Sequence, residues 1–429
     1  MKKKYRIILY TSIFLLCVVA SIILVVKKSN SVYEEESKPK VVKHKSMLSM
    51  NLEQTAGSGD YKTVTQSKWP TEGYKFNAEL SRCENGSTLS WDDTKKAVIV
   101  SGNLSDKCYV YFDIYQPTLA EYIKSQYTGT QGENNIYYHD SDLANGAGDN
   151  SYRYAGANPN NFVCFGTTES PCPTDNLYRI IGVFGENYHG VTGKQLVKLI
   201  KYDYMTTDEL GTDGDYSQTY KEWGMDSTYK GTYGDGERIG VYYWNYKATG
   251  SATNTWSTSL LNKTNLNTNF INNIGTTWAN KIATVTWKVG GNTWANIGTK
   301  TSSVAYTNEI TNPVTTNTTD NATTYSAKIG LMYVSDYGFA ASPDAWTLTM
   351  SSYNNTTATN NNWMYMGLYE WTISRYADFS DRAFFVNYVG YVVNYNVNGD
   401  FGVRASFNLE SSVSYVSGSG SMSDPIVIN

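Results

Sequence analysis

The acidic residues that could do catalytic or metal chemistry occur in three short polar segments. They are Asp208 with Glu209, Asp213 with Asp215, and Asp235 with Glu237. Two carboxylates can cleave a glycosidic bond, and clustered loop carboxylates also suit Ca²⁺. The surrounding Gly, Thr and Asp residues are typical of turns, where solvated acids are commoner than catalytic ones. We therefore assign no catalytic residue, no metal ligand and no cofactor, and Ca²⁺ stays an open but unsupported alternative.

Nucleophilic catalysis finds equally few candidates in this sequence. The chain has three histidines, His44, His139 and His189, and each is isolated. A Ser-His-acid triad would need His139 or His189, because His44 lies in a polar segment ahead of the folded part. No G-x-S-x-G pattern precedes a predicted helix, and no CxxC motif indicates structural zinc.

Four of the five cysteines form two pairs that are local in sequence. The spacing suggests disulfides Cys83–Cys108 and Cys164–Cys172, one of the three pairings that four cysteines allow. The alternative is four reduced thiols in a cytosolic protein. A predicted membrane segment favours the oxidised state. The fifth cysteine, Cys17, lies inside that segment, and we interpret it as an apolar residue there.

Residues 7–26 are an uninterrupted apolar run with lysines on both sides. The run matches the hydrocarbon thickness of a bilayer, and no small-x-small cleavage site follows it. Both flanks are basic, so their charges do not fix the orientation, but a long C-terminal domain can be translocated regardless. The run predicts a single-pass protein of the cell membrane, with residues 1–6 in the cytoplasm and the C-terminal domain extracellular.

The charge is unevenly divided along the chain. The sequence has 35 Lys and Arg against 39 Asp and Glu, and residues 1–50 hold 10 basic and 3 acidic residues. The remainder has 25 basic and 36 acidic residues and a net charge of −11. Such a surface repels a phosphate backbone, so we expect no nucleic-acid partner.

Composition and alternation indicate the elements that must position any site. Residues 27–70 are polar and lysine-rich and predict a flexible stalk. Short alternating runs predict a small β module over 71–116, stapled by the Cys83–Cys108 bridge. Residues 117–149 read as a connector, and residues 150–429 as one large aromatic-rich domain with few helix signals. Within that domain, the apolar runs 177–184 and 196–200 predict two buried, paired strands. The predicted fold class is therefore a β-rich α+β protein with a transmembrane helix.

The last third of the chain carries a motif order with a family resemblance. Gly367-Leu368-Tyr369-Glu370-Trp371 is followed by Arg375, and then by Gly402 and Arg404. This order is similar to the G-N-V-x-E-W-T … G-F-R run of the formylglycine-generating and C-type-lectin-like fold. The neighbouring segments resemble surface proteins of low-GC Gram-positive bacteria. The resemblance covers residues 160–429 and implies a C-type-lectin-like domain over 150–429. In that fold the motif residues are structural, namely Glu370, Trp371, Arg375, Gly402 and Arg404.

The same resemblance raises an enzymatic reading, because formylglycine generators oxidise their substrate with cysteines late in the chain. No cysteine follows Cys172 in this sequence. A thiol or copper-thiolate mechanism in the C-terminal domain therefore lacks its reacting atoms.

Residues 376–400 are unusually rich in Tyr, Asn, Asp, Phe and Val. Tyr supplies rigid contact area and Asn adaptable hydrogen bonds, so this composition suits a recognition surface. It also resembles the variable region of lectin-fold proteins diversified by retroelements. The other interpretation is a plain β-hairpin with inward aromatic residues, and both stay open. The candidate ligand-binding residues are Tyr376, Asp378, Phe379, Asp381, Arg382, Asn387, Tyr388, Tyr391, Asn394, Tyr395, Asn396, Asn398 and Asp400.

The function expected from the sequence is ligand recognition by an adhesin-like or lectin-like surface protein. The ligand would be a glycan or a protein outside the cell, bound by the aromatic, Asn-rich C-terminal face. The alternative is a cell-wall-associated carbohydrate-active enzyme or a structural surface scaffold.

Overall fold

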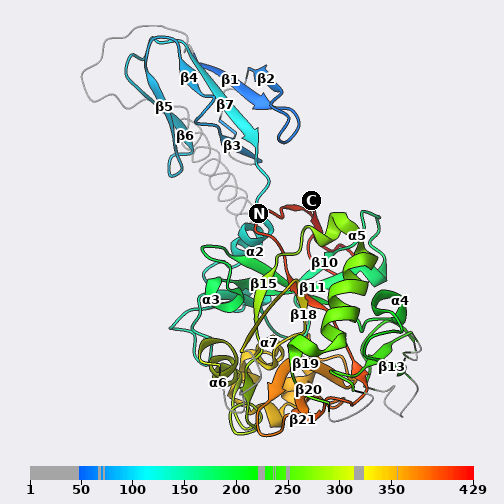
Figure 1. Cartoon of the computed structure of the whole chain (residues 1–429). Helices are drawn as coiled ribbons and strands as arrows, with labels where there is room; N and C mark the ends of the chain where they lie inside the picture. The colour runs from blue at the N-terminus through cyan, green and yellow to red at the C-terminus, as the bar shows by residue number, and fades with distance from the viewer. Residues whose placement is uncertain are drawn as a thin grey trace, which may run out of the picture. The chain divides into compact units, whose positions relative to one another are not determined.

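The computed structural model describes residues 48–65, 69–70, 73–220, 228–234, 236, 238–247, 252–313, 323–354 and 356–429. The chain divides into two compact units, unit 1 up to Gln116 and unit 2 from Pro117 to Asn429. Figure 1 shows the described part of unit 1 as a group of strands and unit 2 as strands with helices around them. The β-rich class predicted from the sequence is confirmed.

Unit 1 contains a five-stranded sheet and a separate hairpin. Its strands are β1 Leu48–Glu53, β2 Tyr61–Val64, β3 Tyr74–Phe76, β4 Arg82–Cys83, β5 Thr88–Asp92, β6 Ala97–Ser101 and β7 Cys108–Ile114. The sheet runs in the order β2-β1-β7-β3, β4 also pairs with β7, and β5 pairs with β6. Its small core is built around Met50, Val110 and Phe112, with Trp91 and Trp69 packed against them.

The first two strands of unit 1 lie in the segment that the sequence predicted to be a stalk. Leu48, Met50 and Leu52 alternate with polar residues, as in a strand. The alternating run is short and lies in a polar segment, so the sequence did not indicate a strand there. The polar positions are satisfied by distant backbone. Asn51 donates to the carbonyl of Val110 at 3.3 Å, and Glu53 accepts from the N–H of Ile114 at 2.9 Å. Both partners lie in β7, whose pairing with β1 cannot be read from local sequence.

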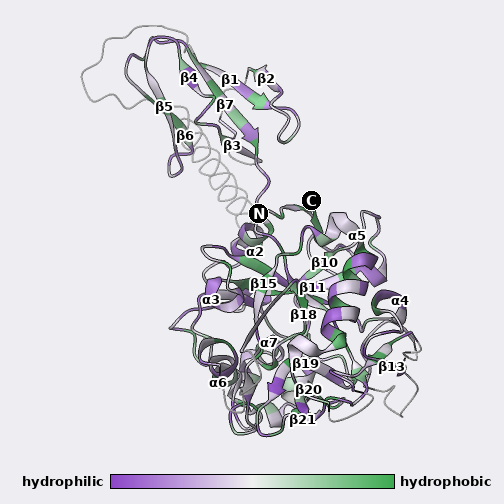
Figure 2. Cartoon of the chain, in the orientation of Figure 1, coloured by the Kyte–Doolittle hydropathy of each residue, from purple (hydrophilic) through white to green (hydrophobic). Residues whose placement is uncertain are grey.

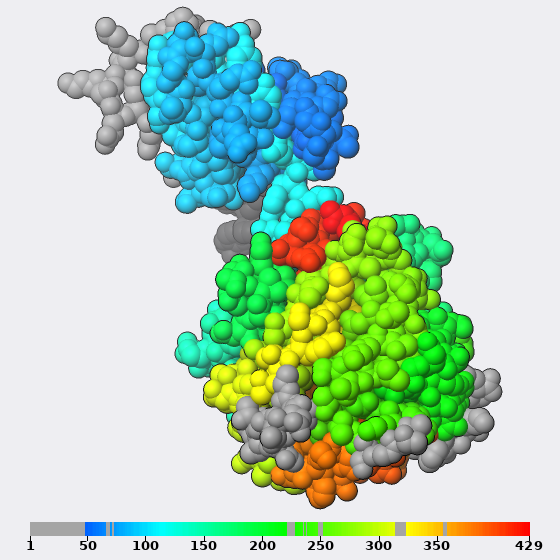
Figure 3. All heavy atoms as spheres, viewed as in Figure 1, coloured from blue at the N-terminus to red at the C-terminus, as the bar shows by residue number. Residues whose placement is uncertain are grey.

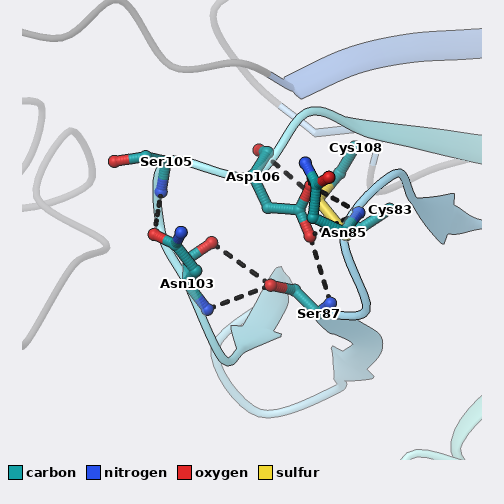
Figure 4. Close-up of a disulfide and its surroundings, with 7 residues drawn as sticks. All are labelled: Cys83, Asn85, Ser87, Asn103, Ser105, Asp106 and Cys108. Atoms are coloured by element: carbon teal, nitrogen blue, oxygen red, sulfur yellow. Dashed lines mark hydrogen bonds between the residues drawn. A yellow bond between two sulfur atoms is a disulfide. The ribbon is translucent and has the colours of Figure 1, made fainter.

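The predicted Cys83–Cys108 disulfide is confirmed and joins β4 to the start of β7. Next to it, the carboxylate of Asp106 accepts hydrogen bonds from the backbone N–H groups of Asn85 and Ser87, at 2.9 and 3.1 Å (Figure 4). The disulfide and this carboxylate together fix the turn that follows β4. They compensate for a core too small to hold the loop by packing alone.

Unit 2 is built on two seven-stranded sheets. The first has the order β18-β23-β12-β11-β9-β8, with β10 also paired to β11. Its strands are β8 Ile136–His139, β9 Ser151–Tyr154, β10 Phe162–Cys164, β11 Leu177–Phe184, β12 Leu196–Lys201, β18 Ile329–Gly330 and β23 Ser406–Asn408. The predicted pairing of the two buried strands β11 and β12 is confirmed, because both are buried along their whole length and pair antiparallel.

The second sheet has the order β13-β14-β22-β19-β20-β21, with β16 also paired to β19. Its strands are β13 Tyr216–Thr219, β14 Gly240–Tyr242, β16 Gly291–Asn292, β19 Glu370–Tyr376, β20 Arg382–Val386, β21 Val392–Asn396 and β22 Phe401–Gly402. Two further pairs are β15 Val285–Lys288 with β17 Thr324–Ala327, and β24 Tyr415–Ser417 with β25 Val427–Ile428.

Short helices surround these sheets. The α-helices are α2 Leu119–Ser125, α3 Glu186–His189, α4 Thr207–Leu210, α5 Ile271–Ala279, α6 Ser302–Tyr306, α7 Val334–Ala340 and α8 Thr356–Asn360. The 3₁₀ segments are η1 Glu133–Asn135, η2 Thr174–Asn176, η3 Trp256–Thr258, η6 Pro343–Thr347 and η7 Met350–Ser352, and η4 Leu261–Phe270 and η5 Thr307–Thr311 are π-helical. The predicted connector, 117–149, belongs to unit 2, where it contributes α2 and β8. The predicted Cys164–Cys172 disulfide is also confirmed.

The single-pass anchor predicted from the sequence, and the cell-membrane localisation that rested on it, stand corrected. Among the residues described, no helix is both long and apolar enough to cross a bilayer, which takes about 20 apolar residues. The longest helical run of the described residues, η4 with α5, is rich in Asn and Thr, and Figure 2 shows many hydrophilic residues along it. The predicted span, residues 7–26, and the predicted tail, residues 1–6, lie outside the described residues.

Candidate functional site

The Tyr- and Asn-rich stretch forms the hairpin β20–β21 at the edge of the second sheet of unit 2. The two strands pair antiparallel from Arg382 opposite Asn396 to Val386 opposite Val392. On its inner side β20 pairs with β19, and β21 is the last strand of the sheet. Figure 3 shows this part of the chain, coloured orange, at the surface of unit 2. The hairpin predicted from the sequence is therefore present, and its two faces decide which residues a ligand can reach.

One face of this hairpin carries a layered aromatic cluster. Phe385 lies opposite both Trp371 of β19 and Val393 of β21, and directly opposite residues share a face. The ring of Phe401 packs on both buried rings, 4.4 Å from Trp371 and 4.6 Å from Phe385. These three buried residues form a rigid aromatic base.

Tyrosines lie on this base and reach solvent. Tyr395 packs 5.6 Å from Phe401 and is 52% exposed, while Tyr369 packs 5.1 Å from Phe401 and 5.4 Å from Tyr388. Burial raises the pKa of the Tyr369 hydroxyl, and Tyr388, Tyr391 and Tyr395 raise it further. Tyr369 and Tyr395 thus share Phe401 as their support, Tyr388 packs on Tyr369, and Tyr391 directly precedes β21. We call Tyr369, Tyr388, Tyr391 and Tyr395 the tyrosine platform.

The turn between the strands fixes the platform in place. The side-chain oxygen of Asn387 accepts from the N–H of Val389 at 3.0 Å, and its carbonyl accepts from Gly390 at 2.7 Å. Gly390 has φ +103° and its carbonyl accepts from the buried hydroxyl of Tyr337 at 2.7 Å. A side chain at Gly390 would meet the backbone carbonyl of Tyr353 at 2.9 Å. These hydrogen bonds tie the turn to the interior of unit 2. The turn therefore holds the platform tyrosines in place even when no ligand is bound.

The opposite face of the hairpin buries Phe384, Val386 and Val392 and is polar toward its other end, where Arg382, Asn394 and Asn396 lie. The guanidinium of Arg382 lies 4.6 Å from the ring of Phe379, which is 51% exposed, and donates to Asn394 at 3.3 Å. Asn396 donates to the carboxylate of Asp381 at 2.9 Å. These polar side chains hydrogen-bond to one another, so much of their hydrogen-bonding capacity is already used within the hairpin.

The structure thus divides the thirteen candidate residues into different environments. Tyr376 and Asn387 are buried, the first against Phe384 and the second inside the turn, so neither can contribute contact surface. The exposed ones are Asp378, Phe379, Tyr395 and Asn398, and the partly exposed ones are Asp381, Arg382, Tyr388, Tyr391, Asn394, Asn396 and Asp400. Asp400 accepts from Gln218 at 2.7 Å. Sequence reasoning missed Tyr369 as a platform residue, although it stands in the Gly-Leu-Tyr-Glu-Trp motif, one residue before β19.

The motif residues around β19 are structural. Glu370 and Arg404 form a buried bidentate ion pair at 2.8 and 2.9 Å. Trp371 donates to the carbonyl of Tyr242 at 2.8 Å. A side chain at Gly402 would lie 2.6 Å from the ring of Tyr204. Arg375 has a different environment from Arg404, since its Nε donates only to the carbonyl of Val289, at 3.1 Å.

The carboxylates that opened the sequence analysis are used to hold backbone and side chains. Glu209 pairs with Lys201 at 2.8 Å, and Asp213 accepts from Asn269 at 2.6 Å. Asp215 accepts from the N–H groups of Tyr246 and Leu261, at 2.9 and 2.8 Å. Asp235 and Glu237 lie outside the described residues. Within the described ranges, no group of three or more His, Cys, Asp or Glu side chains could hold a metal ion.

A second polar cluster lies inside unit 2, and no sequence motif indicates it. Lys198 and Asp336 form an ion pair at 2.7 Å, and the hydroxyl of Tyr188 donates to Asp336 at 2.6 Å. Arg153 pairs with Asp149 at 2.8 Å and lies 3.8 Å from Asp336. We call these five residues the buried charge cluster. Lys198 and Asp336 have completely buried side chains, so their acid and base groups are closed to a substrate.

Comparisons of the chain with protein-family models, with curated proteins and with solved structures found no match. The resemblance to the C-type-lectin-like fold therefore stays a prediction from the motif order.

Proposed function

We propose that unit 2 is a ligand-recognition domain and that it binds a glycan through the tyrosine platform. The observation that carries this proposal is a rigid, solvent-facing group of tyrosines on a buried aromatic base. Tyr395 offers an exposed ring face, Tyr369 packs on the same Phe401 ring, and Tyr388 packs on Tyr369. Rigid aromatic rings with a polar end suit recognition, because little conformational entropy is lost on binding.

The chemistry of the platform favours a neutral ligand rich in hydroxyl groups. Its four side chains are phenols, which offer hydroxyl groups and no ammonium, guanidinium or carboxylate group, and burial raises the pKa of Tyr369. A tyrosine hydroxyl both donates and accepts. A sugar ring presents an apolar C–H face and a rim of hydroxyls, which complement a ring face and neighbouring phenols. An enzymatic alternative has no comparable support, because the densest ionic cluster of unit 2 is buried.

Glycan-array binding of the full chain tests this function, with affinities measured by titration for each sugar that is bound. Tyr395→Ala should weaken binding about tenfold or more, since it removes the exposed ring (a contact worth about 1–3 kcal/mol). The matched control is Phe379→Ala, because Phe379 is an aromatic residue of the same exposure next to the opposite face of the hairpin.

If Tyr395→Ala binds the same sugars as the parent and Phe379→Ala does not, the platform is the wrong face. If the chain binds no glycan and instead captures a protein with the same dependence on Tyr395, the face is right and the ligand class is wrong.

A further inference from the structure

Arg375 differs from the other buried arginines of unit 2. Arg153 pairs with Asp149, and its Nη1, which also lacks a hydrogen bond, lies 3.8 Å from the carboxylate of Asp336. Arg404 pairs with Glu370, and Arg179, which has no carboxylate partner among the described residues, donates from all three of its nitrogens to Asn161, Trp363 and Pro159. Arg375 is 2% exposed, and its Nη2 is buried without a hydrogen-bond partner among the described residues. A buried guanidinium without an anion is costly, because it has lost its hydration and gained no opposite charge.

The strand pairing brings backbone close against this guanidinium. β16 runs parallel to β19 and places Gly291 opposite Arg375. A Cβ at Gly291 would lie 2.9 Å from Cζ of Arg375. Glycine at that position therefore makes room for the guanidinium, whose Nε is held by the carbonyl of Val289.

A small hollow adjoins Arg375. Its free volume is about 10 Å³, which is room for one water-sized particle. The lining residues are Thr255, Trp256, Ser257, Val289, Thr324, Tyr325 and Arg375. Trp256 is also 2% exposed, and its Nε1 is buried with no acceptor in the part of the chain that the structure describes. Two residues that line this hollow, Arg375 and Trp256, thus each carry a buried N–H donor that has no acceptor among the described residues.

The charge of the lining sets the kind of occupant. Among the described residues, Arg375 is the one charged side chain of this lining, and no carboxylate belongs to it. Burial lowers the pKa of Arg375, whereas at Arg404 burial lowers the pKa but Glu370 more than compensates and raises it above its usual value. The indole N–H and the guanidinium only donate. A group that binds both the indole N–H of Trp256 and the guanidinium of Arg375 must therefore accept hydrogen bonds. If that group is negatively charged, it also supplies the counterion that Arg375 lacks.

We propose that the hollow between Arg375 and Trp256 is a binding site for a single small inorganic anion of the halide class, such as chloride. The anion would accept from Nη2 of Arg375 and Nε1 of Trp256, and the hydroxyl-bearing residues Thr255, Ser257, Thr324 and Tyr325 border it. The site is separate from the tyrosine platform and does not depend on the glycan proposal. Because the anion binds the native state, it raises stability with its concentration.

Bromide replaces chloride and is located by anomalous scattering, so the first test uses crystals of the unmodified protein grown in bromide. A bromide peak in the hollow, beside Arg375 and Trp256, is the expected result. A water molecule there and no peak would overturn the proposal. This measurement needs no substitution and cannot be confused with misfolding.

The second test follows thermal unfolding of the full chain as chloride replaces gluconate at constant ionic strength. The Tm should rise by about 2–4 °C and then level off as the site fills. Trp256→Phe and Arg375→Gln should abolish this rise, whatever their own effect on the starting Tm. Arg382→Gln, which removes a surface guanidinium, should leave it unchanged. A bromide peak without a saturable rise in Tm would show an adventitious ion only and would also overturn the proposal.

Discussion

The buried charge cluster and the tyrosine platform are both polar sites of unit 2, but they differ in access and in charge. The cluster joins ionised side chains by short contacts, 2.7 Å between Lys198 and Asp336, and excludes solvent from them. The platform is uncharged and leaves Tyr395 half exposed. Groups that look catalytic in composition are thus committed to holding the interior together. The exposed groups that could contact a ligand are the phenol side chains of the platform, which are less reactive than ionised acids and bases. In this molecule, accessibility separates the buried polar residues from those that the proposed ligand would contact.

The cluster is held together by mutual compensation of its charges. Burial lowers the pKa of Lys198, and Asp336 acts in the opposite direction. Burial would raise the pKa of Asp149, but Arg153, together with Ser151, His139 and Tyr306, outweighs it and the pKa is lowered. Because each ion depends on a partner, removing one leaves an uncompensated charge in a low-dielectric interior.

The largest effect is expected for Asp336→Asn. The change keeps the shape of the side chain but leaves Lys198 and Arg153 facing a neutral amide, so the free energy of unfolding should fall by about 3–5 kcal/mol. Urea denaturation of the full chain measures it. Asp344→Asn, at an exposed position, is the matched control and should change stability by less than about 0.5 kcal/mol. Equal losses for the two variants would show that the cluster is not a stabilising unit.

The second prediction concerns His139, which lies beside this cluster. Its Nδ1 accepts from the N–H of Ala147 at 3.0 Å, so the native ring can take a second proton only by losing that bond. Burial and then Arg153 lower its pKa well below 6.5, while Asp149 opposes them. Below about pH 6.5 the unfolded chain therefore binds a proton that the native state refuses.

Stability should accordingly be retained above about pH 6.5 and fall as the pH drops below it. His139 alone contributes up to about 1.4 kcal/mol per pH unit. His189, whose pKa burial also lowers, adds a similar slope. Denaturation curves between about pH 6.5 and 5 measure the total, and His139→Gln should remove its own share of the slope. An unchanged slope in that variant would mean that the native ring is protonated.

The fold was only partly readable from the sequence, and the particular elements show why. The two disulfides and the pairing of β11 with β12 were predicted, because cysteine spacing and long apolar runs are local signals. β1 was missed because its pairing partner, β7, begins far along the chain, at Cys108. The predicted membrane span lies outside the described residues, and the described helices do not supply one.

The sequence predicted which segment holds the candidate site, but not which of its side chains lie together on an exposed face. The composition of residues 376–400 indicated recognition, yet the faces of a strand alternate with every residue, and register decides which face is open. The pairing of Ala383 with Tyr395 places Tyr395 on the face of Phe385 and Trp371, away from Arg382. The buried charge cluster could not be predicted at all, because Lys198 and Asp336 are 138 residues apart and meet only through the fold.

The smallest expected change in stability sharpens the comparison most, because one substitution can be made in both regions. Tyr395→Phe removes a single hydroxyl that no described residue binds. It should alter the free energy of unfolding by less than about 0.5 kcal/mol and weaken glycan binding about two- to tenfold, the value of one hydrogen bond.

Tyr188→Phe serves as the paired control. Its hydroxyl bonds Asp336 and accepts from Lys198 at 2.6 Å, so its loss should cost about 1–3 kcal/mol of stability. Binding by the protein that remains folded should not change. Denaturation and titration of both variants give a two-by-two comparison. If Tyr395→Phe lost stability or Tyr188→Phe lost affinity, the division between a structural interior and a recognition surface would not hold.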